Sequence, residues 1–220
     1  MRVSELAAVL GIPQSSASML VRTMVERGYR DWASNSRAVQ PTLRLALLGS
    51  WLDDQFSNAG GLHDMLSEIA LRCEDTVLLG AEMGIRVQYV HVVQGSHPLR
   101  YDIKRGATRY LVDANAGRVL LSLKSNDEIE RIVTRTNAER TDRHIDRKSF
   151  HCEISRIREQ GYSFGENLVI PGASVIAAPL RSGTVHRPLA VGIAGPTERL
   201  ENHLVPNVEL LSQVMAKYVE

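Results

Sequence analysis

The residues between positions 14 and 22 carry the side chains best suited to contact with another molecule. Three serines, a glutamine and an arginine fall within a segment of helical periodicity. Their hydroxyl, amide and guanidinium groups can hydrogen-bond DNA phosphates or base edges. The segment therefore predicts a DNA-recognition helix, and the alternative is the solvated face of an ordinary helical hairpin. The predicted DNA-binding residues in it are Gln14, Ser15, Ser16, Ser18 and Arg22.

Patterns typical of catalysis are missing from the sequence. The chain has no GxSxG elbow, no HExxH motif and no phosphate-binding loop. His151 and Cys152 are adjacent, but neighbours on a helix point about 100° apart and do not face each other. We therefore expect no catalytic residue, no metal site and no cofactor, and an enzyme that uses Cys152 is a weaker alternative. Ligand spacing is likewise missing among His63, His91, His97 and His144.

The composition predicts a globular chain with a basic N-terminal end. The 220 residues are 44% hydrophobic and 23% charged, which allows one large or two modest domains. Residues 1–45 carry six arginines against three acidic side chains, whereas the net charge of the whole chain is only +1. This asymmetry favours nucleic-acid binding by the N-terminal end.

Hydropathy and cysteine usage predict a cytoplasmic protein that binds no membrane. No apolar run approaches the ~20 residues that span a bilayer, and the N-terminus does not resemble a signal peptide. Cys73 and Cys152 lie far apart, without the spacing of a disulfide framework or a zinc ribbon.

Two short helices joined by a turn must position the candidate DNA-binding residues. We expect Ser4 to cap the first helix and Gly11 to close it in the left-handed conformation. Pro13 suits the first turn of the second helix, which should end near Arg27, before Gly28.

A β-hairpin is predicted to follow, with its turn at residues 34–36. A hairpin directly after a recognition helix is a wing, so Arg30 and Arg37 would lie beside the DNA backbone and join the predicted DNA-binding residues. The alternative is a surface loop. An apolar helix over residues 43–59 is then expected to connect this domain, residues 1–42, to the rest of the chain.

Residues 60–220 alternate helices with strands. Strands joined by short turns pair antiparallel, so this region predicts an α+β domain with an antiparallel sheet flanked by helices. Such a domain can hold a small-molecule pocket between sheet and loops. Helices are predicted over 62–73, 125–135, 146–161 and 206–219, with another after Gly117; strands are predicted around Met83 and Gly84 and over 162–170, 173–180 and 188–195.

Five stretches in this order resemble the IclR family of bacterial transcription regulators. The resemblance covers nearly the whole chain and implies a winged helix-turn-helix domain, a linker helix and a GAF-like effector domain. It further implies a dimer or tetramer that binds operator DNA and responds to a small metabolite, often an organic or aromatic acid. The stretches are SELAAVLGIPQSSASMLVRTMVERGY, DANAGRVLLS, REQGYSFGEN, PGASVIAAPL and VGIAGPTERL.

By this resemblance, an effector pocket is formed by the loop 106–117 and by strands near residues 174–178 and 193–195. Tyr89 and His91 alternate along a strand, so we expect them to share a face that forms a pocket wall. A helix that begins near Ala116 would offer free N–H groups to a carboxylate. The predicted effector-binding residues are Tyr89, His91, Gly106, Leu111, Asp113, Asn115, Ala116, Gly117, Ser174, Ile176, Ala177, Ile193 and Ala194.

The sequence departs from the family pattern at several positions. Family members usually have a full helix before the helix-turn-helix, whereas Met1 stands almost inside it, so the expectation is either a truncated start or a domain without one core element. Met19 occupies a position that is commonly Arg, and Val175 one that is frequently Cys. The alternative to an operator-binding regulator is thus a degenerate member that acts as a dimeric ligand-binding or interaction protein.

Overall fold

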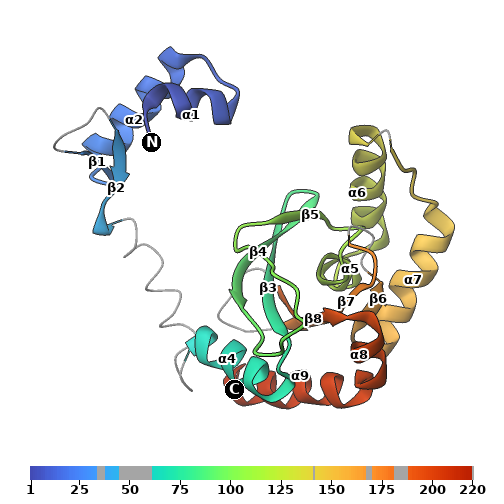
Figure 1. Cartoon of the computed structure of the whole chain (residues 1–220). Coiled ribbons are helices and arrows are strands. Elements are labelled where there is room, and N and C mark those ends of the chain that lie inside the picture. The colour runs from blue at the N-terminus through green and yellow to red at the C-terminus, as the bar shows by residue number, and fades with distance from the viewer. Residues whose placement is uncertain (34–37, 45–60, 141, 167–169, 181–187, 220) are drawn as a thin grey trace. The chain divides into compact units, whose positions relative to one another are not determined.

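A computed structural model describes residues 1–33, 38–44, 61–140, 142–166, 170–180 and 188–219. The chain divides into two compact units, Met1–Gln55 and Phe56–Glu220, and each is described by itself (Figure 1). Of the predicted linker helix, only residues 43 and 44 lie within the described part of the chain.

The N-terminal unit begins with a helix-turn-helix. Gly11, with φ of +63°, closes the first helix in the left-handed conformation, as predicted. The prediction that Ser4 caps this helix is wrong. The helix begins at Val3, and the Glu5 carboxylate accepts a hydrogen bond from the Arg2 backbone N–H at 2.8 Å. The helices are α1 (Val3–Leu10) and α2 (Gln14–Glu26).

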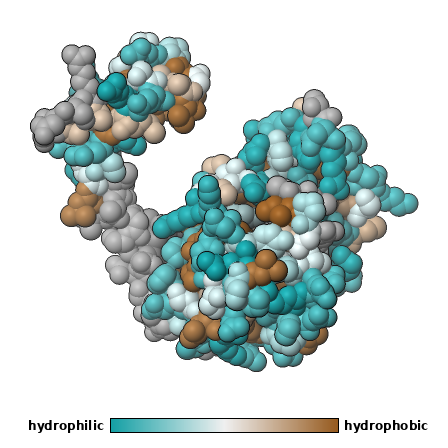
Figure 2. All heavy atoms as spheres, viewed as in Figure 1, coloured by the Kyte–Doolittle hydropathy of each residue, from teal (hydrophilic) through white to brown (hydrophobic). Residues whose placement is uncertain are grey.

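A short hairpin and the two helices enclose a small apolar core. Strands β1 (Arg30–Trp32) and β2 (Val39–Pro41) pair antiparallel, which confirms the predicted hairpin, although its turn lies outside the described residues. Ala17 and Val21 of α2 are buried, whereas Leu20 beside them in the sequence is 43% exposed. Figure 2 shows further hydrophobic side chains at the surface of this unit.

The C-terminal unit is built on one antiparallel sheet of six strands. Their order is β5-β4-β3-β8-β7-β6, so β3 and β8, from opposite ends of the unit, are neighbours at the centre. This arrangement confirms the predicted α+β class. The strands are β3 (Thr76–Met83), β4 (Arg86–Val93), β5 (Thr108–Tyr110), β6 (Ser163–Glu166), β7 (Ala173–Leu180) and β8 (Leu189–Pro196).

Helices cover both faces of this sheet and create two cores (Figure 1). The first core buries apolar side chains of α5 against one face, with α6 and α7 packed behind. The second core lies on the other face, beneath α4, α8 and α9. The helices are α4 (Gly61–Cys73), α5 (Asn115–Ser122), α6 (Asn126–Glu139), α7 (Arg147–Gln160), α8 (Thr197–Asn202) and α9 (Leu204–Val219).

Capping groups mark the starts of two of the predicted helices. Ser125 and Glu128 form a capping box at the start of α6, and the Asp146 carboxylate accepts the Ser149 N–H at the start of α7. The short elements β5 and α8 were not predicted, because three to six residues give too little periodicity to recognise.

A β-bulge in the sheet changes which side chains face which core. The register between β3 and β4 shifts so that Val90 has no residue opposite it on β3. The extra residue breaks the alternation of the strand: Tyr89 packs in the core beside α5, whereas His91 contacts His63 of α4. The prediction that Tyr89 and His91 share a face is therefore wrong.

Candidate effector cavity and DNA-recognition helix

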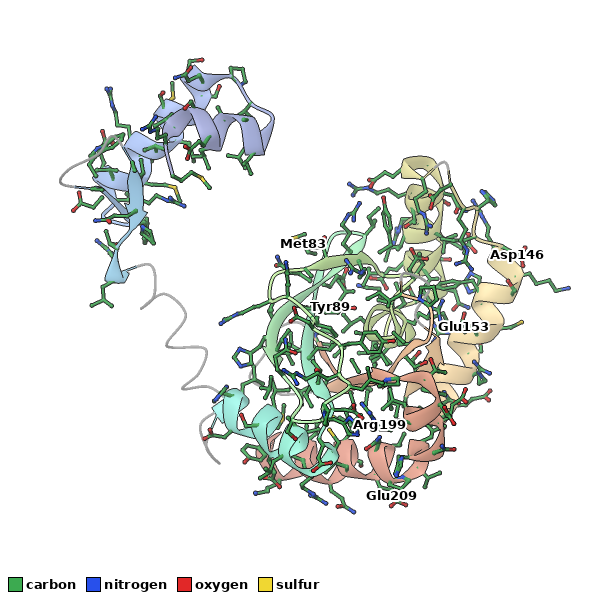
Figure 3. The ribbon with its side chains drawn as sticks, viewed as in Figure 1. Met83, Tyr89, Asp146, Glu153, Arg199 and Glu209 are labelled. Atoms are coloured by element: carbon green, nitrogen blue, oxygen red, sulfur yellow. The ribbon has the colours of Figure 1, made fainter. Side chains whose placement is uncertain are left out.

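A cavity of ≈ 220 Å³ lies among β4, β5, β7, β8 and the segment that precedes β5. The strands contribute mostly apolar or hydroxyl-bearing side chains, and the preceding segment contributes polar ones. Tyr89 of β4, labelled in Figure 3, lines the cavity and is only 5% exposed. The lining residues are Tyr89, Tyr101, Asp102, Ile103, Lys104, Ala107, Arg109, Ile170, Ala173, Ser174, Val175 and Ala194.

The charged groups of the cavity favour an anion. Arg109 and Lys104 line it together with a single carboxylate, Asp102, which already accepts a hydrogen bond from Gln94. The Arg109 guanidinium donates to its neighbour's carbonyl at 2.9 Å, and no carboxylate of the described residues pairs with it. Burial raises the pKa of Tyr89, and Arg109 opposes that rise. The phenol therefore stays protonated and can donate a hydrogen bond.

Three of the predicted effector-binding residues line this cavity: Tyr89, Ser174 and Ala194. The Ser174 hydroxyl also lies 2.9 Å from the hydroxyl of Thr197. Gly106 is adjacent, because its N–H donates to the Tyr89 carbonyl at 2.7 Å.

Five other predicted residues lie away from the cavity lining. Ile176 and Ile193 belong to the core beneath α4 and α9, on the opposite face of the sheet. Leu111 and Ala177 are buried in the core beside α5. His91 lies on the α4 side of the bulge.

The start of α5 is held by its own packing and does not line the cavity. The Asp113 carboxylate accepts a hydrogen bond from the mostly buried Arg140 guanidinium at 2.7 Å. The Asn115 amide donates to the Gly165 carbonyl at 2.8 Å and accepts from the Ser163 hydroxyl at 2.7 Å. These contacts fix α5 to its neighbours.

Close packing explains why small residues, Gly117 and Ala116, occupy two further positions at the start of α5. A Cβ on Gly117 would lie 2.3 Å from the Leu111 carbonyl oxygen, so the helix reaches its position only with glycine there. The Ala116 side chain lies against Gly80 of β3. Both are packing positions beside the sheet.

Sequence reasoning missed the segment that forms one side of the cavity. We call residues 97–104 the strap. The Tyr101 carbonyl of the strap accepts a hydrogen bond from the buried Thr76 hydroxyl at 2.9 Å. The Ile103 carbonyl accepts one from the Gln94 side-chain amide at 3.0 Å. The sequence did offer one signal for the strap. It belongs to a long segment without regular structure between two strands, and such loops are often functional.

Arg199 anchors the beginning of the strap (Figure 3). Its guanidinium donates two hydrogen bonds to the nearly buried Asp75 carboxylate. It also donates to the Leu99 carbonyl at 2.8 Å and lies 3.0 Å from Nδ1 of His97. One arginine therefore joins α8, the start of β3 and the strap.

The N-terminal unit presents the predicted recognition residues to solvent. All five on α2 are exposed, while Ala17 and Val21 turn inward. Arg30 is half-buried on β1, and its Nε is buried without a hydrogen-bond partner; Arg37 lies outside the described residues. The exposed residues are Gln14, Ser15, Ser16, Ser18 and Arg22.

Three side chains that could act as bases or nucleophiles, His151, Cys152 and Cys73, lie outside the cavity lining. Nε2 of His151 lies 2.6 Å from a Glu130 carboxylate oxygen, while Cys152 is exposed on the same helix. Burial raises the pKa of the Cys73 thiol to about 11, which keeps it in the unreactive form. Within the described ranges, no three or more His, Cys, Asp or Glu residues gather as metal ligands, and no helix has the length and apolarity to cross a bilayer.

Comparisons with known proteins agree with this architecture. Residues 61–217 match the model described as bacterial transcriptional regulator IclR C-terminal, and residues 1–29 match the IclR helix-turn-helix domain. The HTH-type transcriptional regulator KdgR of Dickeya chrysanthemi is 24% identical over 201 residues, which cover 90% of this chain and 65% of that protein. The chain thus spans just under two thirds of that relative.

Two further relatives show the same likeness. The Glycerol operon regulatory protein of Streptomyces coelicolor is 28% identical over 210 residues, covering 94% of this chain and 82% of that protein. An IclR homolog from Microbacterium hydrocarbonoxydans, solved in complex with 4-hydroxybenzoate, superposes with a TM-score of 0.76 at 16% identity, covering 100% of this chain and 90% of that chain. The match over residues 61–217, together with the helix-turn-helix match, shows that the chain belongs to the IclR family of bacterial transcriptional regulators.

Proposed function

We propose that this regulator acts in the cytoplasm as a dimer or tetramer, binds operator DNA through α2 and the hairpin, and responds to a small organic acid. The observation that supports an acidic effector is Arg109, because it lines the cavity without a carboxylate partner among the described residues. No reaction is assigned to the chain. Its family consists of transcriptional regulators.

The cavity chemistry supports a carboxylate beside an apolar or aromatic body. Arg109 can donate charge-assisted hydrogen bonds to a carboxylate, and the protonated Tyr89 hydroxyl can donate another. Apolar side chains such as Val175 and Ile170 would contact the rest of the ligand. The complex of the Microbacterium homolog with 4-hydroxybenzoate supports the same ligand class.

Operator binding is supported by the chemistry of the exposed face of α2. Hydroxyl and amide groups occupy its N-terminal end, and Arg22 follows one to two turns later. An effector can alter operator binding only through different affinities for two states of the protein, so the organic acid must prefer one of them.

Fluorescence anisotropy with labelled DNA from upstream of the chain's own gene and its neighbours tests the proposal. We expect salt-sensitive binding, because arginine–phosphate contacts release counterions. Arg22→Ala should weaken binding about tenfold, as expected when one base or phosphate contact is lost. Arg27→Ala is the matched control, since it removes the same charge from the C-cap of α2, about 140° around the helix axis from Arg22.

Three results separate the possible outcomes. Tenfold weakening by Arg22→Ala with a small effect of Arg27→Ala supports recognition by α2. Equal weakening by both variants would show that net charge alone drives binding. The degenerate-member alternative would be favoured by wild-type protein that binds none of these DNAs at 50 mM salt.

A further inference from the structure

A second cavity, of ≈ 540 Å³, lies among the end of α4, the start of the strap, α8 and α9. It shares no lining residue with the effector cavity. Arg199, labelled in Figure 3, lines it together with His97 of the strap. Its volume falls within the range of small-molecule sites, about 300–1,000 Å³.

The Asn207 side chain is the feature of this cavity that packing does not explain. Asn207, on α9, lines the cavity and is only 7% exposed, yet no hydrogen bond joins its side-chain amide to another described residue. Among the described residues, only Nε of Arg30 is fully enclosed without a partner, so the Asn207 amide keeps access to the open space of the cavity. Asparagine is a poor residue for a helix interior, and an unpaired amide in a buried position costs free energy. A ligand that hydrogen-bonds this amide would offset both costs.

The rim of the cavity at the end of α4 has a strained backbone. Glu74 lines the cavity with a φ of +61°, the only positive φ of a non-glycine residue in the described part of the chain. Its carbonyl accepts the His97 N–H at 3.0 Å, and a Cβ on Gly95 would lie 2.4 Å from the same oxygen. Residues held in such conformations by their neighbours are common at ligand sites. These contacts fix the rim to the first residue of the strap.

The charges of the lining balance, which favours an uncharged ligand. Arg199 donates two hydrogen bonds to the Asp75 carboxylate, so these two charges neutralise each other. Arg72 and Glu74 add one charge of each sign. With neutral histidines the lining therefore carries no net charge, and either sign of ligand charge would meet a like charge in it.

The two histidines of the lining supply a donor and an acceptor. Nδ1 of His97 lies 3.0 Å from Nη1 of Arg199 and 3.2 Å from the Leu99 nitrogen, both of which are donors, so the neutral ring carries its proton on Nε2. Nδ1 of His203 lies 3.0 Å from the Arg199 carbonyl oxygen, so this ring carries its proton on Nδ1 and keeps a lone pair on Nε2. The Asn207 amide both donates and accepts. Such a mixture suits hydroxyl groups, because each hydroxyl also donates and accepts.

We propose that this cavity is a second small-molecule site, which binds an uncharged polyhydroxylated molecule through the Asn207 amide. The ligand contacts the strap at His97, whereas residues 101–104 of the same segment line the effector cavity. Binding at this site requires neither the acidic effector nor operator DNA.

Nuclear magnetic resonance titration of the full-length protein with D-glucitol, D-gluconate and D-glucamine tests the ligand class. The three probes share one hydroxylated carbon chain and are neutral, negative and positive. We expect saturable binding of D-glucitol, about tenfold tighter than that of either charged probe, because the lining has no net charge. Tighter binding of D-gluconate or D-glucamine at the same residues would overturn the proposed class.

Asn207→Leu tests the site itself. It should weaken D-glucitol binding about tenfold, as expected when two hydrogen bonds are lost. The thermal midpoint of the unliganded variant should be unchanged or higher, because the amide has no partner among the described residues. A purely structural asparagine would instead lower the midpoint.

Two further variants locate the bound probe. Asn202→Leu makes the same replacement at an exposed position of α8 outside the lining and should leave binding unchanged. Arg109→Gln removes a guanidinium of the effector cavity and should also leave it unchanged. Equal weakening by Asn207→Leu and Asn202→Leu would overturn the site, as would weakening by Arg109→Gln alone, which would place the probe in the effector cavity. Absence of saturable D-glucitol binding at millimolar concentrations would overturn the proposal without affecting that for the acidic effector.

Discussion

At the scale of single residues, Arg109 is the side chain on which the effector proposal depends. It lines the cavity beside Tyr89, and its guanidinium donates a hydrogen bond to the carbonyl of Thr108. A guanidinium so placed retains donors for a ligand carboxylate, since it has five N–H groups.

Replacing this guanidinium should remove selectivity for carboxylates. We expect Arg109→Gln to weaken binding of monocarboxylates, 4-hydroxybenzoate among them, about 10- to 100-fold, because a hydrogen bond to a charged group contributes about 1.5–3 kcal/mol. The corresponding amides should bind both proteins alike. Calorimetry with matched acid–amide pairs measures the difference.

Arg86→Gln provides the control for net charge. Arg86 lies over the Tyr110 ring at 4.1 Å and does not line the cavity. If both variants lose carboxylate binding equally, a general field rather than a direct contact attracts the ligand. If neither variant loses it, the acid binds elsewhere.

The sequence pointed to several residues whose structural surroundings it could not reveal. Gly117 and Asn115 stood out in a stretch typical of the family, but the structure shows one in backbone contact with Leu111 and the other bonded to Gly165. Both partners are determined by tertiary packing. Within the predicted pocket loop 106–117, the sequence gave no reason to select Arg109, because its role depends on which strands lie beside β5.

At the scale of elements, the strap depends on one arginine. Arg199 holds Leu99 and His97 while its charge is balanced by Asp75. A lysine there could pair with Asp75 but could not also reach the strap with a planar fork of donors.

We therefore expect Arg199→Lys to loosen the strap selectively. Amides in residues 97–104 should exchange hydrogen at least tenfold faster, while α9 keeps its protection. Hydrogen-exchange mass spectrometry measures both segments in one experiment. Arg72→Lys is the control, since Arg72 makes only a 3.8 Å pair with Glu68. Uniformly faster exchange would instead indicate global destabilisation.

Elements were predictable where the cause is local. Ser125 with Glu128, and Asp146, mark helix starts because their bonds are made within one turn. The bulge at Val90 was not predictable, because it arises from pairing with β3 across the sheet. Consequently the strands were correct but the faces of β4 were not.

At the scale of the whole molecule, the two units differ in how much apolar surface they bury. The described part of the N-terminal unit buries Ala7, Ala17, Val21 and Val39, whereas the C-terminal unit has two extensive cores. Val9 of α1 remains 73% exposed. A small core of small side chains contributes little to the free energy of unfolding.

The N-terminal unit should therefore unfold at a lower urea concentration than the C-terminal unit. The only two tryptophans, Trp32 and Trp51, both fall within Met1–Gln55, so tryptophan fluorescence reports that unit alone. Circular dichroism at 222 nm reports mainly the larger one. We expect the fluorescence midpoint to lie below the dichroism midpoint, and a fragment of residues 56–220 to keep the latter. Coincident midpoints would show that the units unfold together.

The bulge in β4 has a consequence for how such proteins diversify. Val90 and His91 both lie on the α4 side of the sheet, so deleting the codon for Val90 would restore strict alternation while Tyr89 and His91 stay on opposite faces. A single inserted or deleted codon at this point could thus add or remove a contact with α4 without changing any residue of the cavity wall. Gene comparisons that count only replaced residues would overlook this change.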